Sequence, residues 1–296
     1  MRYGTSVICA VLAAVLFALA AVMQQESTLT VATEKSLSPG LLLDLLRRPK
    51  WLVGMLSMVS GFGLQAVGLA FGPVALVQPI VVLELAFAIP FGILRRHRRA
   101  GYREWAGIAA VMAGISIFLL AANPANGVQN PPSWQWIASL VPVGGVAAVC
   151  VILGSTRQGP TRAMFLGSAA GLAFGVLAVL TKTVTHLLST DVAKAFLSWP
   201  IYLTIGVGIV ALTVSQSAYQ AGPLAYSMPF VGVLEPLVAV IIGDAVLGEA
   251  VKLSETDFIL ELAAATVACL GILLLTTSRT VLSIYEERPE PSASLC

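Results

Sequence analysis

Two glutamates interrupt the most apolar stretches of the chain. Glu84 stands within "IVVLELAFAIP" (80–90), and Glu235 stands within "VGVLEPLVAVII" (231–242). A charged carboxylate at the centre of a membrane helix costs about 2.5–3.5 kcal/mol, so it must face a cavity, pair with a partner or bind a proton. Because protonation removes the charge, such groups can couple protons to a movement. A structural glutamate, hydrogen-bonded to a neighbouring helix, is the alternative interpretation.

Further polar side chains occur in the same apolar regions. Gln216, Tyr219 and Gln220 recur at helical positions i, i+3 and i+4, so they share one face. That face could bind a polar solute, or it could join helices through hydrogen bonds. Lys182 could attract an anionic solute or extend to the membrane interface. The remaining candidates are the solute-binding Gln65, Gln78 and Ser227 and the helix-breaking Pro79, Pro229 and Pro236.

The amino-acid composition indicates whether these polar side chains lie in a soluble protein or in a membrane protein. Hydrophobic residues make up 57% of the 296 residues, charged residues make up 11%, and mean hydropathy is +0.89. A soluble domain carries about 25% charged residues, so the composition predicts a membrane protein. The net charge of +2 is too small to predict nucleic-acid binding.

Motifs for catalysis and for cofactor binding are not found in the sequence. Four scattered cysteines form no CxxC pair, which predicts neither a disulfide framework nor a metal site. The chain also lacks GxSxG, HExxH and P-loop patterns. We therefore expect no enzyme, no cofactor and no ATP-driven pump.

Apolar segments of membrane-spanning length predict an all-α polytopic membrane protein. A bilayer core of about 30 Å requires about 20 apolar residues in a helix. Nine segments meet this need, and thirteen of the seventeen basic residues fall on one side if the N-terminus is outside and the C-terminus is cytoplasmic. The plasma membrane is the expected location. The nine expected spans are 4–25, 51–71, 74–94, 104–122, 134–153, 163–187, 200–220, 224–243 and 257–277.

An internal repeat organises these spans. "GPVALVQP" (72–79) returns as "GPLAYSMP" (222–229), and aligning the two superposes spans two to four on spans seven to nine. Because the units are displaced by five helices, an odd number, they must cross the membrane in opposite senses. The sequence thus predicts two inverted four-helix repeats joined by a linking helix. The expected regions are 1–122, the linker 123–159, the second repeat 160–279 and a disordered cytoplasmic tail, 280–296.

The second repeat resembles a known family. "VLEPLVAVIIGDAVLGE" (233–249) is similar to the EamA-type helix of the drug/metabolite transporter superfamily, with Leu-Glu-Pro at mid-helix and a closing Gly-Glu. The resemblance implies inverted repeats that move small solutes by alternating access. Two features depart from the family pattern: nine spans are found instead of ten, and span three of the first half ends in "AIPFGILRRH" instead of Gly-Glu. Nine spans and "LQAVGLAFGPVALVQP" also resemble NIPA-type magnesium transporters.

We therefore expect a secondary transporter for a small polar metabolite or drug-like solute, with proton coupling through Glu235 and Glu84. A magnesium transporter, a flippase for a lipid-linked headgroup and a non-transporting membrane scaffold are the alternatives. The expected partners are the solute or ion, protons and the lipid bilayer, and a homodimer is left open.

Overall fold

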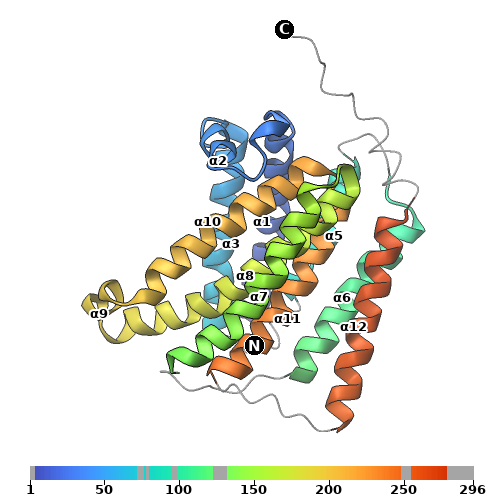
Figure 1. The fold of residues 1–296 in the computed structure, drawn as a ribbon. Helices are drawn as coiled ribbons and strands as arrows, with labels where there is room; N and C mark the ends of the chain where they lie inside the picture. The colour runs from blue at the N-terminus through green and yellow to red at the C-terminus, as the bar shows by residue number, and fades with distance from the viewer. Residues whose placement is uncertain are drawn as a thin grey trace.

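The computed structural model describes residues 4–71, 77, 80–94, 99–122, 132–247 and 255–278. These residues form helices and connecting turns, without a strand (Figure 1). Gln78, Pro79 and the expected tail, 280–296, lie outside the described residues.

Six of the helices are long and apolar enough to cross a membrane, which confirms the expectation of an α-helical membrane protein. The apolar stretches lie in α1 (Gly4–Thr28), α3 (Pro49–Phe71), α7 (Ser133–Ser155), α8 (Gly159–Thr190), α10 (Trp199–Ala221) and α11 (Met228–Leu247). The other expected spans contain α5 (Glu84–Leu94), α6 (Tyr102–Ala122) and α12 (Glu255–Thr276). Short elements are η1 (Thr33–Lys35), α2 (Pro39–Leu45), α9 (Val192–Leu197) and η2 (Leu224–Tyr226).

Three groups of closely packed helices build the bundle: α1 on α3, α8 on α10 and α11, and α6 on α12. Small residues permit the close approach. A Cβ placed on Gly114 of α6 would lie 2.6 Å from the backbone of α12 at Ala264 and Ala268. As Figure 1 shows, α6 and α12 run side by side at one edge of the molecule.

The contact of α8 with α11 runs along one row of glycines. A Cβ on Gly167 would lie 2.8 Å from the carbonyl oxygen of Ser227, and one on Gly171 would lie 3.0 Å from that of Phe230. One turn further, a Cβ on Gly175 would lie 2.7 Å from the carbonyl oxygen of Glu235. The spacing of four residues keeps the row on one helix face. Gly167 and Gly171 thus serve the packing of α8 against α11.

Several helix termini meet at one end of the bundle. The side chain of Gln25, near the end of α1, donates a 2.7 Å hydrogen bond to the carbonyl of Gly222, just after α10. A Cβ on Gly222 would lie 3.2 Å from Cβ of Ala163, in the first turns of α8. The start of α8 therefore lies beside the ends of α1 and α10. We call this the basic end, because its connecting segments hold Lys35, Arg47, Arg48 and Arg157 and the first turn of α3 holds Lys50.

Candidate functional site

Glu84 is the first residue of α5, a helix of 11 residues. The sequence placed this glutamate at the middle of a continuous span, but Val82 and Leu83 form a turn immediately before it. Eleven helical residues cover about 16 Å, or half of a bilayer core. A carboxylate in the first turn of a helix is stabilised by the helix dipole. The interruption thus provides a local reason for an acidic residue at this depth.

Glu235 lies in the middle of α11, one residue before Pro236. Proline has no N–H group, so Pro236 cannot bond to the carbonyl of Gly232, and the helix is weakened there. The backbone at Glu235 is nevertheless held on one side by its close contact with Gly175 of α8. This side chain, like that of Glu84, is half-buried.

The structure brings Glu84 and Glu235 within electrostatic range of one another, although they are 151 positions apart in the sequence. Glu84 and Glu235 are close enough for their charges to repel one another, and both act electrostatically on the hydroxyl group of Tyr219 in α10. The backbones meet nearby, where a Cβ on Gly232 would lie 3.5 Å from the Leu85 side chain. Both carboxyl groups are surrounded by protein and still partly accessible. We call these three residues the carboxylate cluster.

Two charged carboxylates within electrostatic range of one another in a medium of low dielectric constant are unfavourable. A proton or a cation held at the pair would relieve the repulsion. The cluster is therefore suited to binding a positive species reversibly.

Gln216, in contrast, is held in a buried hydrogen-bonded chain that joins three helices. Its amide group donates to Oε1 of Gln24 in α1 over 2.7 Å, and its Oε1 accepts from the Trp51 indole of α3 over 3.0 Å. Gln24 in turn donates to the sulfur atoms of Met55 and Met58. These contacts favour the helix-joining interpretation of Gln216. Trp51 and Gln24 were not predicted as partners, because nothing in their local sequence indicates a contact 165 or 192 residues away.

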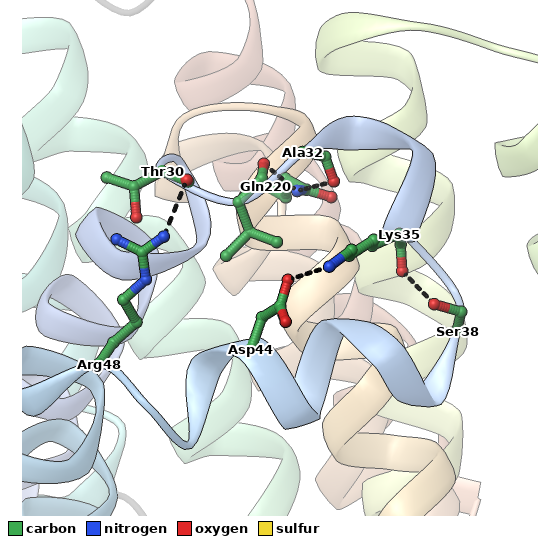
Figure 2. A network of polar contacts seen from close by, with 8 residues as sticks. Thr30, Ala32, Lys35, Ser38, Asp44, Arg48 and Gln220 are labelled. Atoms are coloured by element: carbon green, nitrogen blue, oxygen red, sulfur yellow. Dashed lines mark hydrogen bonds and ion pairs between the residues drawn. The ribbon is translucent and has the colours of Figure 1, made fainter.

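Gln220 holds a segment that covers the end of α10 (Figure 2). Its amide group donates to the carbonyls of Val31 and Ala32 over 2.8 and 3.3 Å. We call residues 29–48 the strap; Leu41 and Leu45 of its helix α2 are fully buried. Two polar contacts join residues within the strap. Lys35 forms an ion pair with Asp44, and Arg48 donates a hydrogen bond to the carbonyl of Thr30.

The hydrogen bond from the Lys35 ammonium holds the pKa of Asp44 below its ordinary value of 3.8. Because the pKa of Asp44 is lower in the folded protein than in the unfolded chain, this contact stabilises the strap at pH values above the ordinary pKa of Asp44. The stabilisation is lost as the pH falls through the folded-state value.

The other predicted site residues are dispersed. Ser227 is fully buried next to η2, and its hydroxyl lies 3.5 Å from the carbonyl oxygen of Leu224. Gln65 is half-buried in α3, and Lys182 is exposed in α8. Pro229 is the second residue of α11, where its missing N–H costs no internal helical bond. Among the described residues, no three His, Cys, Asp or Glu side chains are grouped as metal ligands.

Comparison with known proteins gives one relative over nearly the whole chain. The uncharacterized protein Cgl0250/cg0304 of Corynebacterium glutamicum is 30% identical over 294 residues, which cover 96% of this chain and 98% of that protein. The chain belongs to the same family as this protein. No family model and no solved structure matches it.

Proposed function

We propose that the chain is a secondary transporter in which Glu84 and Glu235 couple the passage of a small polar solute to protons. The observation that carries this proposal is the carboxylate cluster itself. It joins one glutamate from each half of the chain, inside the bundle, with Tyr219 beside them. A structural role for either glutamate would not require the second one nearby, where it adds repulsion.

The proposed architecture is two inverted four-helix repeats, 1–122 and 160–279, joined through 123–159. Matched helices pack alike: α1 packs on α3 as α8 packs on α10. The end of α1 and the start of α8 meet at the basic end, which is expected if these two helices cross the membrane in opposite senses. Each repeat of such a pair can open one face of the membrane while the other closes.

In the proposed cycle, the carboxylate pair holds a proton while the site is closed to water. The proton offsets the cost of two adjacent charges in a dry interior, and solute binding in the open state displaces it. Tyr219 offers the solute a hydroxyl group beside the pair. Gln216 and Gln220 hold α10 in place, so they act on the solute only through the position of Tyr219.

Proton flux in proteoliposomes tests this function even before the solute is identified. Vesicles carrying the purified protein and an internal pH-sensitive dye would be challenged with a panel of amino acids, amines, sugars and nucleosides. We expect at least one solute to drive proton movement that Glu84→Gln and Glu235→Gln each abolish. Ser215→Ala, a nearby change on α10, should retain it. Solute movement with unchanged proton flux in both glutamine variants would reject the coupling role.

A magnesium transporter is the second candidate, favoured by the same pair of carboxylates, because Mg²⁺ prefers oxygen ligands. In that case sub-millimolar Mg²⁺ should raise the thermal stability of the purified protein, and each glutamine variant should remove the effect. A scaffold would show neither proton flux nor a Mg²⁺ effect.

A further inference from the structure

An apolar groove lies between α5 and α6. Its volume is about 480 Å³. It is lined by Ala86 of α5 and by Trp105, Ile108, Ala109, Met112, Ala113 and Ser116 of α6.

The residues of α6 in the groove form one helix face. Positions 105, 108, 109, 112, 113 and 116 follow the spacing of three and four residues that keeps side chains on one side of a helix. Ile108 is buried at the base of the groove, whereas Trp105, Ala109 and Ala113 are exposed. The groove is therefore open to the surroundings of the bundle, which for this chain are the acyl chains of a bilayer.

The dimensions of the groove match one leaflet. From Trp105 to Ser116 the helix rises about 16 Å, close to the roughly 15 Å of half a bilayer core. Trp105 lies in the first turn of α6, and tryptophan is enriched where the apolar core meets the headgroups. The other end of the groove, at Ser116, is then expected about half a bilayer core deeper.

Positive charge lies beside the end of the groove that is marked by Trp105. Arg103 is the second residue of α6, and Arg99 is exposed in the segment leading into that helix. Arg103 donates one hydrogen bond to Thr277 at the end of α12, which fixes its position there. A guanidinium group has five donors, so phosphate oxygens can still bind it.

We propose that the groove binds an anionic phospholipid of the surrounding bilayer, with one acyl chain against α6 and the phosphate at Arg99 and Arg103. Small side chains at Ala109 and Ala113 leave the space for the chain. Two arginines select the negative headgroup, and each basic residue near a membrane surface strengthens anionic-lipid binding about fivefold. This site does not depend on which solute the protein moves.

Native mass spectrometry of the full-length protein tests the site, with phosphatidylglycerol and phosphatidylcholine of identical acyl chains as probes. We expect one phosphatidylglycerol to remain bound in preference to phosphatidylcholine. Ala113→Phe should fill the groove and remove the bound lipid of either type. The matched control is Ala148→Phe, at an exposed position of α7, which should leave the lipid in place.

Removing the charges should affect selectivity alone. Arg99→Gln and Arg103→Gln should each reduce the preference for phosphatidylglycerol about fivefold while phosphatidylcholine binding is unchanged. Equal binding of the two lipids by the wild-type protein would overturn the headgroup assignment. Lipid retention by Ala113→Phe equal to that of Ala148→Phe would overturn the acyl-chain site. A dimer that Ala113→Phe dissociates, without loss of lipid, would instead assign the groove to a second copy of the chain.

Discussion

At the scale of single residues, polar groups within this bundle have two distinct kinds of surroundings. Gln216 and Gln24 satisfy one another and Trp51 in a closed chain of hydrogen bonds. Glu84 and Glu235 do the opposite, since each carboxyl group lies within electrostatic range of a like charge. Buried polar groups that satisfy each other indicate stability, whereas a repulsive pair indicates a site where binding changes the charge.

Gln216→Leu is expected to destabilise the protein. The substitution keeps a side chain of similar size, but it removes the buried hydrogen bonds that Gln216 makes with the Trp51 N–H and with the Gln24 oxygen. Such a loss costs about 1–2 kcal/mol. Thermal unfolding of the purified protein in detergent should show a lower midpoint, with an unchanged midpoint for Ser215→Ala. An unchanged midpoint for Gln216→Leu would mean that the chain contributes no net stability.

The chemical types of these residues could be predicted from sequence, but their pairing could not. Apolar flanks identify Glu84 and Glu235 as costly positions, and helical spacing puts Gln216 and Gln220 on one face. Whether that face meets a solute or another helix depends on elements far away in the chain. The partners of Gln220, for example, are carbonyls 188 and 189 residues away.

At the scale of helices, glycine rows decide how closely the elements around the carboxylate cluster approach. The row on α8 brings its backbone against that of α11 at Glu235, beside the weak point created by Pro236. The position of Glu235 is therefore set from outside α11. Local sequence identifies the small residues, but the helix that they contact is known only from the fold.

Gly175→Ala is expected to disturb this contact. The added methyl group would lie 2.6 Å from Cβ of Val238 and 2.7 Å from the carbonyl oxygen of Glu235, so α8 and α11 must separate. Overpacking of this kind costs about 1–3 kcal/mol. We expect a lower thermal midpoint together with weaker solute-driven proton flux, because the carboxylate moves.

Gly206→Ala on α10 is the matched control, since a Cβ there would meet no atom within 4 Å. It should leave the midpoint unchanged or raise it slightly, because alanine favours the helix by up to about 1 kcal/mol. Equal effects of the two substitutions would mean that helix propensity, and not the α8–α11 contact, is responsible.

The interruption before Glu84 was not predicted from sequence. Apart from Glu84 the stretch 80–90 is apolar, and such a run carries no periodicity from which a turn at Val82 and Leu83 could be predicted. Tertiary packing decides the local structure here, as Leu85 and Ile89 of α5 are fully buried against the rest of the bundle. The membrane class, by contrast, follows from composition alone.

At the scale of the whole molecule, the two ends of the bundle differ in charge, and this difference predicts its orientation. Eight of the ten lysines and arginines in the described part of the chain lie at one end, namely Lys35, Arg47, Arg48, Lys50, Arg99, Arg103, Arg157 and Arg162. Positive segments remain on the cytoplasmic side, so we expect the basic end inside the cell and the start of α7 outside. The proposed lipid site would then lie in the inner leaflet, where anionic headgroups attract basic segments.

Cysteine labelling in intact cells checks this orientation. In a variant whose four native cysteines are replaced by serine, a new cysteine at Ser133, the first residue of α7, should react with a membrane-impermeant maleimide. A cysteine at Ser38 in the strap should react only after the cells are permeabilised. The reverse pattern would put the basic end outside and move the lipid site to the outer leaflet. The carboxylate cluster would be unaffected, because it lies between the two ends and its chemistry does not depend on which end faces the cytoplasm.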